Sequence, residues 1–135
     1  MRTVLILASI LVALTASCKI CYSESAVTAR QLQKMAGEIN ATLPLQLDSE
    51  MVLYRVVAYD NKELVYQIQT ISVNASDIDF NIVKKLMRPK IKNSLCTMPD
   101  TLAFLRMGII YTYSFHDKNN YYMGKFSITP KDCGF

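Results

Sequence analysis

Four cysteines and one histidine are the residues of this 135-residue chain that most readily support catalysis, metal binding or cross-linking. His116 stands at the end of an apolar segment, and the chain has no second histidine to share a metal or complete a nucleophile–base pair. Asp77 and Asp79 are better interpreted as negative charge at the start of a helix than as an acid/base pair. The four glycines form no phosphate-binding loop. The sequence therefore predicts no catalytic residue, no metal site and no cofactor, and we expect a protein that is not an enzyme.

Two of the cysteines bracket the C-terminal segment of the chain. If Cys96 and Cys133 pair, closing the loop between them stabilises the fold by about 4 kcal/mol through the entropy of the unfolded chain. Such a bond requires an oxidising compartment. Cys18 and Cys21 have the spacing of a redox pair but lack the βαβ context that this motif needs. Whether the chain is exported is therefore the next question.

The N-terminus has the order of a secretory signal peptide. Arg2 gives a positive start, residues 4–14 form an unbroken run of apolar and small residues, and small residues follow at 15–17. This run is far shorter than the roughly 20 apolar residues that a spanning helix needs. We therefore expect residues 1–25 to be a signal peptide and residues 26–135 to be one domain.

The sequence offers two alternative positions for cleavage of the signal peptide. Cleavage near residue 17 would make Cys18 the first residue, and the sequence from Leu14 to Cys18 loosely resembles the lipobox in which such a cysteine is lipidated, although Thr15 departs from it. Cleavage near residue 25 would remove Cys18 and Cys21 with the signal. Either cut changes the net charge from +4 to +3, because the first removes Arg2 and the second also removes one lysine and one glutamate. Such a weakly basic charge does not argue for nucleic acid.

The remaining patterns predict alternating helices and hairpins. Residues 26–43 have helical spacing, residues 52–59 and 64–71 form a hairpin, and residues 78–95 form a helix, capped by Ser76 or Asp77, that Pro89 should kink or end. A short helix capped by Thr97 runs to Gly108, and residues 109–116 and 121–129 form a second hairpin. The tyrosines lie at strand spacing, so sheet packing explains them better than base stacking does. We expect a two-layer α+β domain, with a four-stranded antiparallel sheet from two hairpins and helices on one face.

Positive charge is concentrated on the middle helix. Its cationic residues are Lys84, Lys85, Arg88, Lys90 and Lys92. They form either a solvated face or a surface that contacts anionic lipid headgroups or an acidic partner.

The whole pattern resembles the AspS-type pilotins of bacterial type II secretion, and a broader set of small exported bacterial proteins without an assigned role. The resemblance is carried by Leu43-Pro44 after the first helix, the broken helix that ends at Cys96, the hairpin that follows Gly108, and the close from Thr129 to Gly134. It implies a sheet flanked by helices, with Cys96 and Cys133 as the structural disulfide and Cys18 as the lipid site.

The same resemblance implies a function. Pilotins of this class are lipoproteins that bind a short helix at the C-terminus of the secretin and carry it to the outer membrane. We therefore expect an exported, non-catalytic protein-binding module in the periplasm, with outer-membrane association if Cys18 is lipidated. Its partner would be an amphipathic helix lying in an apolar groove. The alternatives are a soluble periplasmic inhibitor or immunity protein, an uncharacterised secreted protein, and an accessory subunit of an enzyme.

Overall fold

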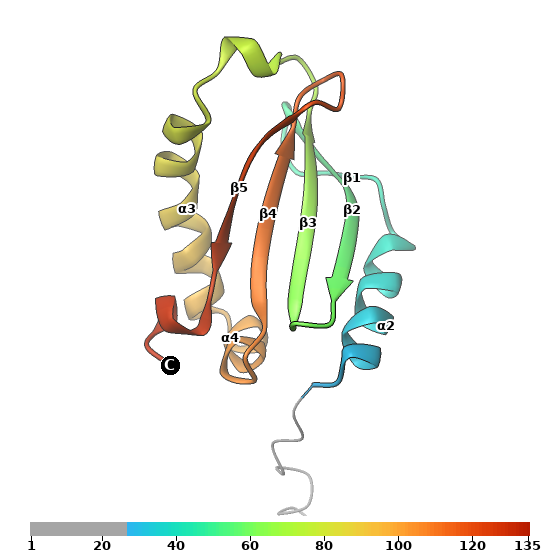
Figure 1. Cartoon of the computed structure of the whole chain (residues 1–135), viewed down its shortest axis with the longest axis vertical. Coiled ribbons are helices and arrows are strands. Elements are labelled where there is room, and N and C mark those ends of the chain that lie inside the picture. Colours follow the sequence, from blue (N-terminus) through green and yellow to red (C-terminus); the bar gives the residue numbers. More distant parts are fainter. Residues whose placement is uncertain (1–26) are drawn as a thin grey trace, which may run out of the picture.

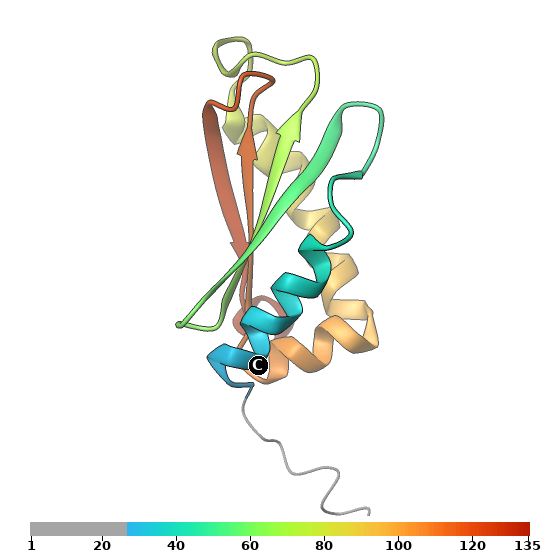
Figure 2. The same cartoon turned by 90° about the vertical axis from the view of Figure 1, so that its right-hand side faces the viewer.

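The computed structural model describes residues 27–135, which form one sheet with helices on one of its faces (Figure 1, Figure 2). The expected signal peptide, both cleavage sites, Cys18 and Cys21 lie outside the described residues. The helices are α2 Ala29–Asn40, α3 Phe80–Thr97 and α4 Pro99–Arg106. The strands are β1 Leu45–Gln46, β2 Met51–Tyr59, β3 Glu63–Thr70, β4 Ile110–His116 and β5 Tyr122–Ile128.

The sheet has five strands in the order β1-β2-β3-β4-β5, so the prediction of four antiparallel strands is wrong in two respects. A two-residue strand, β1, adds to the edge of β2. The two predicted hairpins are present, but they join through β3 and β4, which run parallel with Tyr66 opposite Tyr113. The sheet is therefore mixed.

The parallel join follows from the length of the connection. After β3 the chain returns along the sheet through α3, whose 18 residues span about 27 Å at about 1.5 Å each. The eight residues of β3 span about 26 Å at about 3.3 Å each. One helix thus carries the chain back to the end of the sheet where β3 began, and β4 must start there, as the crossover between parallel strands requires.

The helices begin and end close to their predicted limits, with three differences. Thr28 caps α2 through a capping box with Gln31, and Asp79, rather than Ser76 or Asp77, caps α3. Pro89 lies inside α3 without ending it, because the carbonyl that loses its N–H partner belongs to Lys85 on the exposed side of the helix, where water can solvate it. Thr97 is the last residue of α3 rather than the cap of α4.

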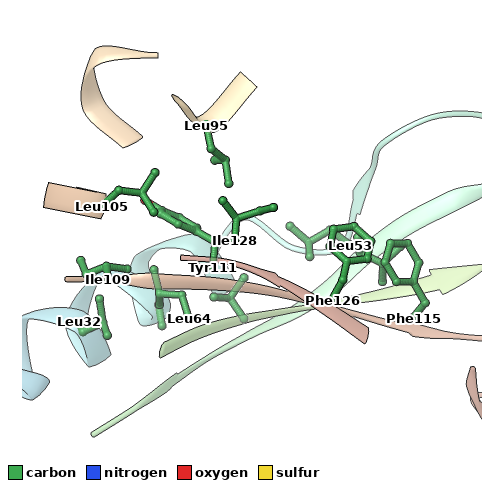
Figure 3. Packing of buried hydrophobic residues seen from close by; sticks show 13 residues of the cluster. Leu32, Leu53, Leu64, Leu95, Leu105, Ile109, Tyr111, Phe115, Phe126 and Ile128 are labelled. Atoms are coloured by element: carbon green, nitrogen blue, oxygen red, sulfur yellow. The ribbon is translucent and has the colours of Figure 1, made fainter. Parts of the chain in front are cut away.

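The core lies between the helices and the sheet. Leu32 of α2 and Leu105 of α4 are 1% and 0% exposed, and they pack with buried side chains from β2, β3, β4 and β5. Figure 3 shows Leu95 of α3 pointing from the helix layer toward Ile128 of β5. Within residues 27–135, no helix lies on the other face of the sheet (Figure 2). No described helix is long and apolar enough to cross a membrane.

Candidate functional site

The C-terminal tail is tied to α3 at two points, and β5 is tied to it at a third. The expected Cys96–Cys133 disulfide is present, with 5.4 Å between the two Cα atoms. Arg88 donates to a carboxylate oxygen of Asp132 at 2.8 Å and to the backbone oxygen of Ser127 at 3.1 Å. The backbone N–H of Thr129 and the Arg88 guanidinium hydrogen-bond to Asp132 and lower the pKa of its carboxyl group. These contacts cross-link the end of the chain to α3, so their role is structural.

His116 lies on the helix-free face at the end of β4, between two tyrosines. Its Nδ1 is 3.2 Å from the Tyr54 hydroxyl, and its ring centroid is 5.8 Å from that of Tyr122. Burial lowers the pKa of His116, and the neighbouring Asp117 opposes this effect. Residues 27–135 contain no group of three or more His, Cys, Asp or Glu placed to hold a metal ion. The contacts of His116 are those of a packed aromatic side chain.

The helix-free face, which we call the open face, is polar. A hollow of about 270 Å³ is lined there by residues that include Glu63, Gln67, Thr112 and Lys125. Thr112 is 0% exposed and hydrogen-bonds to Glu63 Oε1 at 2.6 Å, while its hydroxyl lies 2.7 Å from the Ser127 hydroxyl. These contacts satisfy the buried polar groups of the face and hold its strands in register.

The opposite, helix-side face carries three neighbouring tyrosines in its centre, which we call the tyrosine strip: Tyr66 of β3 with Tyr111 and Tyr113 of β4. The Tyr66 ring stacks on Tyr113 with 5.3 Å between centroids and on Tyr111 with 6.1 Å. Tyr66 and Tyr113 are half-buried, whereas Tyr111 is 3% exposed. In Figure 1, α2 lies beside β2 and α3 beside β5, with β3 and β4 between them. The two helices therefore flank the strip.

The hydroxyl groups distinguish this strip from an ordinary core. None of the three tyrosine hydroxyls hydrogen-bonds to another residue in the described part of the chain. No described side-chain N or O atom is both buried and without a partner, so these hydroxyls are not sealed in the core. Burial raises the pKa of each tyrosine, most strongly for Tyr111 and Tyr113, and the phenols therefore stay neutral donors at physiological pH.

Apolar side chains of α2 and α3, the helices on either side of the tyrosine strip, pack against the same core as the strip does. Half-buried Met35 and Ile39 come from α2, and half-buried Met87 and Ile91 come from the inner side of α3. The result is an apolar surface with polar hydroxyl edges, which suits a partner that offers apolar side chains and a few hydrogen-bond acceptors. The sequence predicted that these tyrosines pack in the sheet, but it did not locate this surface. The parallel pairing that brings Tyr66 beside Tyr113 was not predicted.

The chain has the same fold as two solved type II secretion pilotins. This confirms the resemblance that the sequence predicted. The pilotin EpsS of the Vibrio vulnificus type 2 secretion system matches with a TM-score of 0.61 and 17% identity, over 79% of this chain and 96% of that one. The pilotin AspS of Vibrio cholerae matches with a TM-score of 0.53 and 18% identity, over 78% and 94%. At these identities the match shows a shared fold.

Two further proteins are similar to the chain. A candidate secreted protein from Pseudomonas aeruginosa has a TM-score of 0.65 and 21% identity, over 78% of this chain and 91% of that structure. Protein K of Escherichia coli is 32% identical over 105 residues, which make up 75% of this chain and 54% of that protein. The chain thus spans about half the length of this relative. No family model matches the chain.

Proposed function

We propose that the protein is a pilotin-like accessory of envelope secretion that binds a partner protein and catalyses no reaction. The observation that carries the proposal is the tyrosine strip with the apolar side chains of its flanking helices, in a fold shared with two pilotins. A partner seated there would cover side chains that the domain leaves half-exposed. A protein interface of this kind gains most from aromatic anchors, and tyrosine is enriched among them.

The partner that fits is an amphipathic helix, such as the C-terminal helix of a secretin. Its apolar side chains would contact Met35 and Ile39 on one side and Met87 and Ile91 on the other, as in other helix-in-groove recognition. Its polar edge would accept hydrogen bonds from the tyrosine hydroxyls. Each such bond contributes about 0.5–1.5 kcal/mol when its removal leaves no buried group unpaired.

The proposal includes export. The Cys96–Cys133 disulfide and the signal peptide expected from the sequence of residues 1–25 both support an oxidising destination such as the periplasm. Lipidation of Cys18 would add outer-membrane attachment, which a sorting role needs. Without it, the protein would be a soluble periplasmic binding module.

The direct test is binding of a synthetic peptide with the sequence of the secretin's C-terminal helix, measured by fluorescence anisotropy. We expect Tyr66→Phe/Tyr113→Phe to weaken binding about tenfold, because two hydroxyl donors are removed while both rings remain. The matched control is Tyr59→Phe/Tyr122→Phe on the open face, where the two rings are 50% and 56% exposed, and it should bind as the wild type does.

A second measurement does not depend on substitutions. Methyl NMR of the methionines should show shifts at Met35 and Met87, which lie on the helices that flank the strip, when the peptide is added. Met98, which lies between α3 and α4 and is 50% exposed, should not shift. If the peptide does not bind, or if it shifts Met98 and leaves the other two unchanged, the proposed site is wrong.

A further inference from the structure

The outward side of α3 combines exposed apolar residues with uncompensated positive charge. Ile82 and Leu86 are 59% and 62% exposed, high values for large aliphatic side chains on a helix. Pro89 is also exposed and follows them at helical spacing. Figure 1 shows α3 at the margin of the molecule, with no other element beyond it. This stripe points away from the core that Leu95 and the inner side of α3 help to form.

The charges on α3 have one sign. Five cations and no carboxylate occur among its 18 residues. Arg88 pairs with Asp132 at 2.8 Å, and the other ion pair within residues 27–135 joins Lys34 to Glu38 on α2. The four lysines of α3 therefore have no carboxylate partner in the described part of the chain.

Two of these lysines flank the apolar stripe and share one surface with it. Because each residue turns a helix by about 100°, Lys85 and Lys90 lie on either side of the stripe made by Ile82, Leu86 and Pro89. Beside it is a hollow of about 410 Å³, which is lined by Asn81, Lys84, Lys85, Arg88 and Pro89. Three cationic side chains thus meet around a space that a phosphate group could enter.

We propose that this face of α3 docks on the surface of an anionic lipid bilayer. Ile82 and Leu86 would enter the headgroup region, and the hollow at Lys84, Lys85 and Arg88 would hold a lipid phosphate. Helices that lie in the membrane interface have this combination of an apolar stripe and flanking lysines. An acidic protein would account for the charge, but it would leave two exposed aliphatic side chains without a reason. Charge complementarity and the apolar stripe together favour the bilayer.

This inference is independent of the proposed partner helix. The tyrosine strip faces the inner side of α3, and the docking face is the outer side, so a partner and a membrane could be bound at the same time. Docking would place the axis of α3 parallel to the membrane surface, whether or not Cys18 carries lipid. The two proposals can therefore fail separately.

The test is co-sedimentation with vesicles of phosphatidylglycerol and phosphatidylethanolamine, compared with vesicles of phosphatidylcholine alone. The protein is purified from cells with Cys18→Ser so that no acyl chain is attached, and all variants share one N-terminus. We expect binding to the anionic vesicles alone, and loss of that binding in about 0.5 M salt, where charges are screened within about 4 Å. Lys84→Glu/Lys85→Glu should weaken it tenfold or more, since each basic residue contributes about fivefold near such a surface.

The matched control reverses two exposed lysines elsewhere, Lys118→Glu/Lys125→Glu, with the same change in net charge. It should keep at least half of the wild-type binding. The chain has no tryptophan, so Leu86→Trp gives a specific probe, and its emission should move to shorter wavelength on anionic vesicles. Tyr59→Trp on the open face should not respond.

Three results would overturn the proposal. The first is absence of binding to anionic vesicles at low salt. The second is an equal loss of binding in the Lys84/Lys85 and Lys118/Lys125 variants, which would indicate adsorption by net charge. The third is full binding by Ile82→Ser/Leu86→Ser together with an unshifted tryptophan emission from the Leu86→Trp protein, which would show that the apolar stripe does not enter the bilayer.

Discussion

Removing the disulfide should cost this domain a large part of its stability. Cys96 and Cys133 are separated by 37 positions, and closing a loop of that length lowers the entropy of the unfolded chain by an amount worth about 4 kcal/mol at 25 °C. The total free energy of unfolding of a domain of this size is roughly 5–15 kcal/mol. Both cysteines are only half-buried, so a Cys96→Ser/Cys133→Ser variant should add little packing loss to this entropic cost.

The measurement is urea unfolding followed by circular dichroism. The oxidised wild-type protein is measured without a thiol, and the double serine variant is measured with a thiol. The thiol prevents Cys18 and Cys21 from forming new bonds. We expect the free energy of unfolding to fall by about 3–4 kcal/mol and Tm to fall by about 15 °C. The m-value should rise, because the unfolded chain without the bond exposes more surface. A loss below about 1 kcal/mol with an unchanged m-value would refute the loop-entropy argument, and Cys96→Ala/Cys133→Ala controls for the chemistry of serine.

Three other predictions concern separate features. The pKa of Asp132 is lowered in the folded state, so its contribution to stability is present above the pKa of about 3.9 of the unfolded chain and is lost as pH falls through the folded value. Stability should thus decline less between about pH 5 and pH 2 in Asp132→Asn, and parallel curves would contradict this. A Cβ on Gly124 would overlap the ring of Phe80, and the backbone there has a φ of 159°, so Gly124→Ala should destabilise by about 1–3 kcal/mol, and by less in a Phe80→Ala background, where only the backbone strain remains. Equal effects in both backgrounds would show that the ring is not the cause. Mass spectrometry of the mature protein should find an acylated Cys18 or a free N-terminus at Ala26, whereas an uncleaved chain would contradict export.

The local structure of the domain was predictable because its signals are local. Leu32 and Ala36 have the spacing of a helix face, and Gly108 follows the helix of residues 99–106 as a C-terminal signal. Of the two predicted effects of Pro89, ending the helix is contradicted, because the cost of a proline inside a helix depends on whether the carbonyl it leaves free can reach water. That property belongs to the folded surface and is not visible in the residue itself.

The arrangement of the strands was harder to predict. The parallel pairing of β3 with β4 depends on where α3 delivers the chain, and β1 has only two residues, too few for an alternation to be recognised. For the same reason the tyrosine strip was missed. Tyr66 and Tyr113 are 47 positions apart, and only the three-dimensional register places their rings together. The basic residues of α3 were recognised from sequence, whereas the outward direction of Ile82 and Leu86 required the structure.

At both edges of the sheet, side chains hydrogen-bond to backbone groups of the strands. Just beyond the short β1, the Asn40 amide donates to the Val56 oxygen at 2.8 Å and accepts from the Val56 N–H at 2.7 Å, so one side chain takes the place of a neighbouring strand. At the other edge, the Arg88 guanidinium covers the Ser127 oxygen. Unpaired strand edges are templates for aggregation, and natural proteins block them in such ways. These two residues thus help to keep a sheet with two free margins from adding strands of other chains, which lowers its tendency to aggregate.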